Sequence, residues 1–261
     1  MIAEIAVAAA AFVGLASQIL RKVPTMADFE LFPSVVSRVT ERRGGVHVFP
    51  SLDPKRTAHV VVDLQNGFMA PGQASAVASA AGTVAAVNRI SEALRDAGGQ
   101  VVYLQHTADP AAVESWRSFY DHFVSPERRA KMIEAFTPGS YGHRLWQGLD
   151  VMAGDWVVCK SRFSAFIQGS SDLHERLKAR GVDTLIVTGT VTNVCCESTA
   201  RDAMMLDYKV FFVADGCSSH HPQEQQATLS NMANIFADVV STDEVVGLIG
   251  AACQGVAHAA E

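Results

Sequence analysis

The chain has 261 residues, of which 49% are hydrophobic and 18% charged, so it can bury a large core and is not a disordered protein. Its formal net charge of −6 disfavours a nucleic-acid-binding protein, because such proteins usually present a basic face to the phosphates. We therefore expect the partner to be a small molecule or another protein, with no nucleic acid.

The cysteine count is odd, and no two cysteines have a C-x-x-C spacing. This pattern favours neither a zinc ribbon nor a thioredoxin-type redox pair, and it is typical of reduced thiols in the cytoplasm. We therefore predict a cytoplasmic protein in which one thiol has a chemical role. The cysteines are Cys159, Cys195, Cys196, Cys217 and Cys253.

The opening segment MIAEIAVAAAAFVGLASQIL is apolar and rich in alanine. Three interpretations are open: a helix that packs on this protein or on a sister subunit, an over-long start with translation from Met26, and a membrane anchor. We favour the packed helix and expect no membrane partner. Arg21 and Lys22 follow the apolar run, whereas a secretory signal carries its positive charge before it.

Residues 1–50 are predicted to form an N-terminal extension, an apolar helix plus a loop at TERRGG, and residues 51–261 a single domain. From residue 58 onward, short apolar runs alternate with stretches of helical spacing. The expected strands are 58–64, 100–105, 155–160, 184–189, 209–215 and 237–240. The expected helices are 83–97, stopped by Gly98-Gly99, then 173–180, 195–206, 222–236 and one from residue 242, while the polar, aromatic stretch up to Phe136 has mixed helical spacing.

Continuous apolar strands that alternate with amphipathic helices predict an α/β fold. We expect three layers, α/β/α, around a central, mostly parallel sheet of about six strands joined by right-handed crossovers. Ligands of such sheets bind outside the carboxyl ends of the strands. Polar residues at strand ends are therefore the first candidates for a site.

Three reactive side chains follow apolar strands in this way: Asp63, Lys160 and Cys195. Cys195 comes after a strand-to-helix turn, so its sulfur should lie near a helix N-terminus, and a nearby lysine would further lower its pKa. Each residue also has a structural interpretation: Asp63 as a turn or cap residue, Lys160 as a surface charge, and Cys195 as a buried core residue. Together, however, they satisfy the requirements of an activated nucleophile.

The strings VVVDLQNGF, CKSRFSAF and GTVTNVCCESTARDA resemble the three motif blocks of the isochorismatase-like cysteine hydrolase superfamily, which includes nicotinamidases, N-carbamoylsarcosine amidohydrolases and ureidoacrylate amidohydrolases. The resemblance covers roughly residues 58–246. It implies that Asp63, Lys160 and Cys195 form a catalytic triad, and that Cys196 stands where the family usually has a small apolar residue.

The resemblance also implies a mechanism. Asp63 would take the thiol proton, Lys160 would hold negative charge near the sulfur, and Cys195 would attack a carbonyl carbon to give a thioester-type intermediate. The main-chain N–H groups of Val191 and Cys195 would form the oxyanion hole. A cis peptide is expected at Thr190-Val191.

We predict no metal and no other cofactor. Nicotinamidases of the superfamily hold a divalent metal through an Asp-x-His constellation after the second strand, and here His106 has no aspartate two residues before it. The substrate is expected to be small and flat. Gln65, Phe68, Arg162, Phe166 and Asn193 are the predicted substrate-binding residues, with His220 or His221 as alternative partners for a carboxylate, and Trp116, Phe119, Tyr120 and Phe163 as further walls.

The predicted function is hydrolysis of a linear amide or ureido (carbamoyl) C–N bond. The TNVCCEST segment looks most like ureidoacrylate amidohydrolases, and the presence of Cys195 argues against a true isochorismatase, which commonly lacks that nucleophile. Two alternatives stay open: a nicotinamidase-like or isochorismatase-like hydrolase, and a catalytically silent binding or scaffold protein. We also expect a homo-oligomer, either a dimer or a tetramer.

Overall fold

The structure is a computed structural model that describes residues 30–258. The three interpretations of the apolar opening segment concern residues outside this range. Within it, no helix combines the length and the apolar character needed to cross a membrane.

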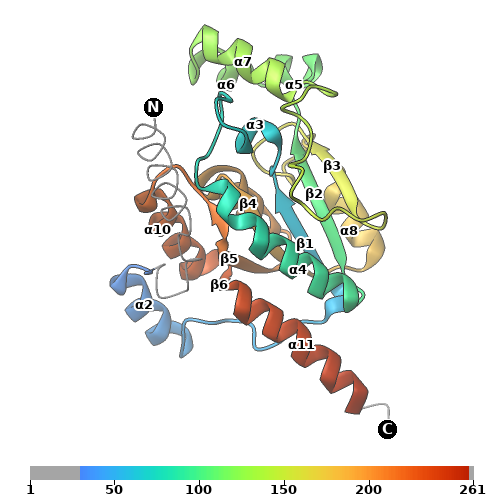
Figure 1. Cartoon of the computed structure of the whole chain (residues 1–261). Helices are drawn as coiled ribbons and strands as arrows, with labels where there is room; N and C mark the ends of the chain where they lie inside the picture. The colour runs from blue at the N-terminus through green and yellow to red at the C-terminus, as the bar shows by residue number, and fades with distance from the viewer. Residues whose placement is uncertain (1–29, 259–261) are drawn as a thin grey trace, which may run out of the picture.

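The core of the protein is one six-stranded sheet (Figure 1). Its strands are β1 Thr57–Val62, β2 Gln100–His106, β3 Trp156–Lys160, β4 Thr184–Thr190, β5 Lys209–Ser218 and β6 Asp238–Val240. They are ordered β3-β2-β1-β4-β5-β6, and every neighbouring pair is parallel. All residues of the central strand β1 are buried, as its continuous apolar sequence predicts. The predicted α/β fold and its strands are confirmed.

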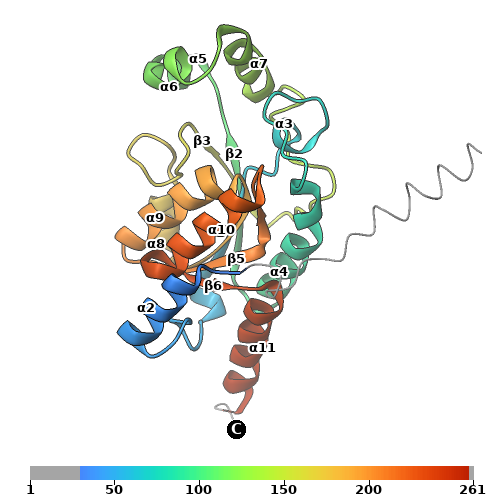
Figure 2. The same cartoon turned by 90° about the vertical axis from the view of Figure 1, so that its left-hand side faces the viewer.

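The helices are α2 Pro33–Arg43, α3 Asn66–Met69, α4 Val84–Asp96, α5 Pro110–Glu114, α6 Arg117–His122, α7 Pro126–Phe136, α8 Leu173–Arg180, α9 Glu197–Met205, α10 Pro222–Asn231 and α11 Thr242–His258. Short 3-10 turns occur at η2 Pro54–Arg56 and η3 Ala80–Thr83, and π turns at η4 Thr192–Cys196 and η5 Met232–Phe236. Helices α8, α9 and α10 cover one face of the sheet, while α4 and α11 cover the other (Figure 2). The chain therefore has the three predicted layers.

Helix α4 shows how sequence spacing places a helix on the sheet. Its apolar positions Val87, Ile90 and Leu94 are fully buried and follow the helical repeat. The helix stops where Gly98 adopts a positive φ of 85°, a conformation that favours glycine. A Cβ at Gly99 would come 2.7 Å from the carbonyl oxygen of Pro54, so a side chain there would clash with the backbone. The predicted stop at this glycine pair is confirmed.

Residues 30–50 pack against the domain. Helix α2 buries Val35 and Val39 and lies against η5, and the guanidinium of Arg43 donates a 2.9 Å hydrogen bond to the carbonyl of Ala233. The prediction that TERRGG forms a loop is wrong for its first four residues. Thr40 to Arg43 form the last turn of α2, because Gly44, at a φ of 85°, provides a left-handed C-cap whose N–H bonds to the carbonyl of Thr40.

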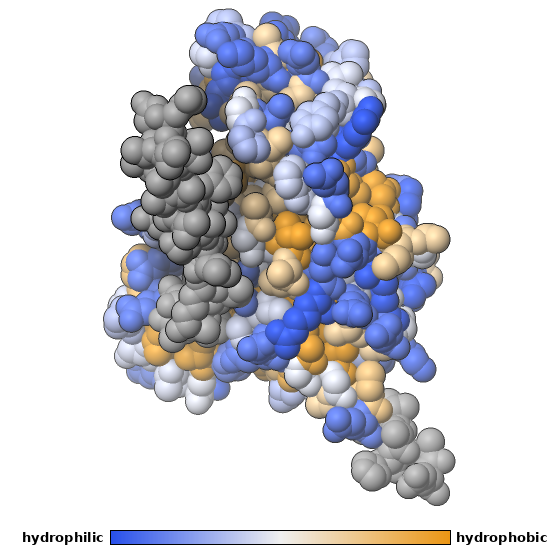
Figure 3. Space-filling view, viewed as in Figure 1, coloured by the Kyte–Doolittle hydropathy of each residue, from blue (hydrophilic) through white to orange (hydrophobic). Residues whose placement is uncertain are grey.

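The three short helices α5, α6 and α7 follow β2 and lie above the carboxyl ends of the strands (Figures 1 and 2). They correspond to the stretch of mixed helical spacing. Their outward surface is mostly hydrophilic on the face seen in Figure 3, while Tyr120 and Phe136 point inward and are buried. These helices form a cover over the edge of the sheet where a ligand is expected.

Candidate active site

The carboxyl ends of the strands bring the three predicted reactive residues together. Asp63 directly follows β1, Lys160 is the last residue of β3, and Cys195 lies in η4 just after β4. The Nζ of Lys160 lies 2.8 Å from Oδ2 of Asp63, and neither side chain is exposed. Lys160 also donates a 3.0 Å hydrogen bond to the carbonyl of Arg162. A buried ion pair therefore lies beside Cys195 at the carboxyl edge of the sheet.

The backbone fixes the direction of Asp63. Its φ of 53° lies in the left-handed region, which aspartate adopts more readily than most residues with a side chain. Its N–H bonds to the carbonyl of Leu104 on β2, and its own carbonyl accepts a 2.7 Å hydrogen bond from Gln65. This tight turn holds the carboxylate at the end of β1.

Glycine is required where β4 passes β1. Gly189 pairs with Val62 at a φ of 116°, and a Cβ there would lie 2.1 Å from the carbonyl oxygen of Val62. The peptide bond that follows Thr190 is cis, as predicted for Thr190-Val191. This close approach of β4 to β1 brings the turn that carries Cys195 near Asp63, the residue that follows β1.

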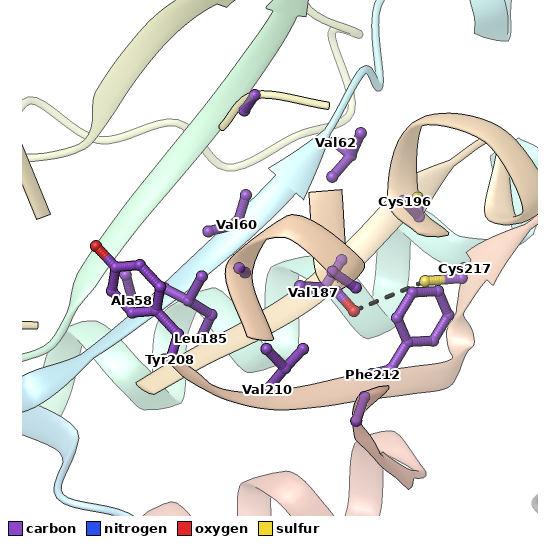
Figure 4. Close-up of a cluster of buried hydrophobic side chains, with 14 of the residues drawn as sticks. Ala58, Val60, Val62, Leu185, Val187, Cys196, Tyr208, Val210, Phe212 and Cys217 are labelled. Atoms are coloured by element: carbon purple, nitrogen blue, oxygen red, sulfur yellow. Dashed lines mark hydrogen bonds between the residues drawn. The ribbon is translucent and has the colours of Figure 1, made fainter. Parts of the chain in front are cut away.

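The two adjacent cysteines occupy different environments. Cys195 lines a cavity, whereas Cys196 is fully buried in the hydrophobic core, where its sulfur lies 3.9 Å from the carbonyl oxygen of Thr188. Figure 4 shows Cys196 among core side chains, with Val187 and Cys217 nearby. Only Cys195 therefore has a sulfur that a ligand in this cavity can reach.

Burial dominates the electrostatics of the site. It raises the pKa of the Cys195 thiol; the charge of Lys160 opposes this effect, and the carboxylate of Asp63 adds to it, so the net shift is upward. The expectation that a lysine and a helix N-terminus would lower this pKa is therefore not met. In the free protein the sulfur carries its proton, and reactivity depends on a neighbouring base.

Asp63 can act as that base. Burial raises the pKa of its carboxyl group above the ordinary value, although Lys160 partly opposes the shift. Burial alone would lower the pKa of Lys160, but Asp63 and Cys195 raise it, so the ammonium keeps its charge at neutral pH. The carboxylate is thus more basic than a solvent-exposed aspartate and sits beside a permanent cation.

A small cavity of about 110 Å³ opens above Cys195. One set of lining residues is apolar: Phe68, Met132, Phe163, Val191 and Val194. The other set is polar: Ser75, His106, Arg128, Cys195 and His220. Apolar walls with a few polar groups are typical of small-molecule sites.

Of the five predicted substrate-binding residues, only Phe68 lines the cavity. The amide group of Gln65 is engaged by the backbone instead: its nitrogen donates to the carbonyls of His106 and His143, at 3.1 and 2.8 Å, and its oxygen accepts from the N–H of His106 at 2.7 Å. Gln65 therefore holds the loops of the site together.

Arg162 and Phe166 are also engaged outside the cavity. The guanidinium of Arg162 donates to the carbonyl and hydroxyl of Ser115, both at 3.0 Å, and lies 5.1 Å from the ring centroid of Trp116. The ring of Phe166 packs 5.6 Å from that of Tyr208, between centroids. Both side chains position loops around the site.

Asn193 adjoins the cavity-lining Val194 without lining the cavity itself. Its Oδ1 is buried and has no hydrogen-bond partner in the described part of the chain. The Val191 N–H, predicted for the oxyanion hole, bonds to no backbone carbonyl of residues 30–258 and is free to donate. The turn before α9 thus offers unused polar groups next to Cys195.

Sequence reasoning missed several lining residues. Arg128 and Met132 belong to α7, where their i, i+4 spacing puts them on one face of that helix. Phe163, predicted as a further wall, lines the cavity, and Trp116 and Phe119 pack against it at 4.7 and 5.2 Å between ring centroids. No local pattern singles out the remaining missed residues, Ser75 and Val194.

The donor set does not suit a metal site. Among residues 30–258, no three His, Cys, Asp or Glu side chains gather closely enough to hold a metal ion. His106 lines the cavity, and its Nδ1 is buried without a partner among these residues. Burial, the largest effect, and the charge of Lys160 lower its pKa well below the ordinary value, so the imidazole is neutral at physiological pH.

A protein-family model described as the isochorismatase domain matches residues 57–244, most of the chain. The chain belongs to the isochorismatase family. The resemblance of the three motif blocks is thereby confirmed, and with it the expectation that the protein is an enzyme of the hydrolase class.

Two kinds of relative support this placement in the isochorismatase family. The chain is 32% identical over 220 residues to the ureidoacrylate amidohydrolase RutB of Caulobacter vibrioides strain CB 15, covering 78% of this chain and 96% of that protein. The crystal structure of a cysteine hydrolase from Pseudomonas syringae pv. phaseolicola superimposes with a TM-score of 0.70 at 32% identity, covering 79% of this chain and 98% of the other. N-carbamoylsarcosine amidase from Thermoplasma acidophilum superimposes with a TM-score of 0.58 at 26% identity, covering 72% and 97%.

Proposed function

We propose that this isochorismatase-family protein is an amidohydrolase that cleaves a linear C–N bond of a small amide or ureide, with Cys195 as its nucleophile. The observation that carries the proposal is the buried Asp63–Lys160 ion pair beside Cys195, whose side chain lines a small cavity. The similarity to a ureidoacrylate amidohydrolase supports the choice of an amide or ureide over other hydrolysable bonds.

The first step is attack of sulfur on the carbonyl carbon. Asp63 removes the thiol proton as the C–S bond forms, because the raised pKa of Cys195 leaves little thiolate beforehand. The carbonyl π electrons move to oxygen, and the N–H groups of Val191 and Cys195 donate to the resulting oxyanion. Lys160 remains charged and offsets the negative charge that develops around the sulfur.

The second step releases nitrogen. When the oxyanion collapses, the C–N bond breaks and the protonated Asp63 donates its proton to the leaving nitrogen, which departs as ammonia or an amine. A thioester or carbamoyl-thioester is left on Cys195. Water then attacks the same carbon, Asp63 accepts a proton from it, and the C–S bond breaks as the thiol regains its proton.

The size of the cavity limits the substrate. Pockets for drug-sized ligands usually measure roughly 300–1,000 Å³, whereas this one measures about 110 Å³. Phe68 and Phe163 contribute aromatic rings to its lining. We therefore infer a short, flat substrate with few atoms beyond the reacting amide or ureide group.

Ammonia release from a panel of small ureides, carbamoyl compounds and linear amides tests the proposal. Cys195→Ala should abolish turnover, whereas the matched control Cys196→Ala should retain most of it, because Cys196 faces the core. The amidohydrolase proposal fails if no member of the panel releases ammonia, and the nucleophile assignment fails if Cys195→Ala remains active. Nicotinamide and isochorismate belong in the panel, since turnover of either alone would favour the alternative hydrolase activities.

A separate measurement distinguishes an enzyme from a catalytically silent scaffold. Iodoacetamide should label Cys195 stoichiometrically and faster as pH rises, because the sulfur is reachable from the cavity. Cys196 should stay unlabelled in the folded protein, since it is buried in the core. Slow labelling of both thiols at equal rates would favour a scaffold.

A further inference from the structure

Strand β3 forms one edge of the sheet and is exposed there. It pairs only with β2, and among residues 30–258 no further backbone hydrogen bond engages Trp156–Cys159 on the other side. Parallel strands normally have both faces covered, yet Val157 is 44% exposed and Cys159 is exposed as well. An unpaired strand edge with apolar side chains is a template for another strand.

The opposite edge of the sheet is protected. Strand β6 has only three residues, all buried, and the carboxylate of Asp238 accepts hydrogen bonds from the N–H groups of Val48 and Phe49 at 2.8 and 2.9 Å. The chain itself therefore covers the edge at β6. β3 lacks the residues that usually protect an edge strand, because it contains no proline and its one charged side chain, Lys160, is buried against Asp63.

The exposed apolar surface of β3 continues onto the loop before it. Val151 and Met152 are 41% and 54% exposed, and the carbonyl of Met152 accepts a hydrogen bond from the N–H of Asp155 in the turn that leads into β3. Figure 3 shows hydrophobic residues gathered on the right-hand side of the molecule, where Figure 1 places β3. Single exposed apolar residues are common, but a contiguous group of them marks a contact surface.

The charge of this surface favours a second copy of the chain as its partner. Trp156–Cys159 carries no charge, and the buried carboxylate of Asp155 is paired with the guanidinium of Arg95 at 2.9 and 2.7 Å. The whole chain has a net charge of −6, so two copies repel each other, and an uncharged surface is where they can approach most closely. Since β6 is covered, β3 is the edge that each copy offers to the other.

We propose that two copies of the chain associate through β3, with the two β3 strands antiparallel across a two-fold axis at Val158, the middle residue of the strand. A two-fold contact places the same surface of each copy against the other. The two six-stranded sheets then form one continuous sheet, and the outward N–H and C=O groups of β3 gain partners. Val157 of each copy lies opposite Cys159 of the other, so the exposed apolar side chains cover one another.

Cross-linking of the full chain at Cys159 tests this geometry. Side chains that are opposite or diagonal on antiparallel strands have Cβ atoms about 5–8 Å apart, within reach of the short thiol cross-linker bismaleimidoethane. Cys253→Ser removes the other exposed thiol among residues 30–258. This variant should give a covalent dimer joined from Cys159 to Cys159, identified by mass spectrometry of its peptides. Adding Cys159→Ser should abolish that product.

Light scattering after gel filtration tests the contact independently. The wild type should have twice the mass of one chain, or a multiple of that mass. Val157→Lys should raise the dissociation constant of the dimer at least about 10-fold, because the two-fold axis brings two new like charges into one contact. Met205→Lys, at a 66% exposed apolar residue of α9, is the matched control and should leave the mass unchanged.

Circular dichroism establishes that each variant is folded before its mass is compared. The proposal is overturned if the wild type is a monomer, or if folded Val157→Lys associates as strongly as the wild type. It is also overturned if the wild type is a dimer in which Cys159 forms no cross-link to Cys159, because the copies would then meet through another surface.

Discussion

The buried ion pair of Lys160 and Asp63 permits a stability test whose size follows from the structure. In Lys160→Met, the fully buried carboxylate would lose its cation and would take up a proton instead. The ordinary pKa of this aspartate is 3.8. Keeping it protonated at pH 7 costs about 1.36 kcal/mol for each of the roughly three pH units above that value, so the loss relative to wild type is at most about 4 kcal/mol, reduced by the part of this cost that burial already imposes on Asp63 in the wild type.

The sign of the pH dependence is fixed by the same reasoning. In Lys160→Met the folded-state pKa of Asp63 is raised, so the loss of stability grows as pH rises above 3.8. At pH 5 the loss should fall below about 2 kcal/mol. The double variant Asp63→Asn/Lys160→Met removes both charges and should recover most of the stability at pH 7, while remaining inactive.

Urea unfolding of wild type, both single variants and the double variant, at pH 5 and pH 7, measures these free energies. A loss in Lys160→Met that is equal at the two pH values would refute the electrostatic reasoning, because lost side-chain packing does not titrate. The same conclusion would follow if the double variant were no more stable than Lys160→Met.

Four further outcomes are expected. In the dependence of kcat/KM on pH, activity should be lost on the acid side as Asp63 takes up a proton. Because burial raises the pKa of Asp63, this loss should occur above pH 3.8; a kcat/KM that stays constant down to pH 4 would contradict this. Burial lowers the pKa of His59 from 6.5 to about 3. Between these two values the unfolded chain binds a proton at His59 and the folded protein does not, so the free energy of unfolding should decrease progressively as pH falls from 6.5 toward 3. Urea unfolding should show about 2 kcal/mol of this loss between pH 6.5 and pH 5, a component absent in His59→Gln. Gly189→Ala should abolish activity and lower the melting temperature, because its Cβ would overlap the carbonyl of Val62; a variant with normal activity would show that β4 can move aside. Treatment with EDTA should leave turnover unchanged, since the described residues gather no set of three metal-ligating side chains, and loss of activity that zinc restores would contradict the prediction of a metal-free site.

Much of the fold could be predicted because its determinants are local. Each strand appears in the sequence as a short apolar run, and each covering helix as a stripe such as that of Val87, Ile90 and Leu94. The stop at Gly98 follows from a conformation that favours glycine. The loop at TERRGG was misassigned because helix α2 extends up to Gly44, and its stability comes from packing against η5.

The reactive residues could be predicted for a related reason. In a parallel sheet all strands end at the same edge, so residues that follow different strands meet there even when they are far apart in sequence. Asp63 and Lys160 lie 2.8 Å apart for this reason. The choice of Cys195 over Cys196 followed from motif spacing, and the two environments are consistent with it.

The sequence by itself therefore determined the fold class, the strand order along the chain and the residues that meet at the sheet edge, because these depend on local pattern and on the geometry of parallel strands. Only the tertiary structure decided how each side chain is used. Gln65 is engaged by His106 and His143, which are 41 and 78 residues away. Arg128 and Met132 line the cavity because α7 lies above the carboxyl ends of the strands. The protonated state of Cys195 depends on burial and on charges brought from two other strands, and neither is encoded near the cysteine.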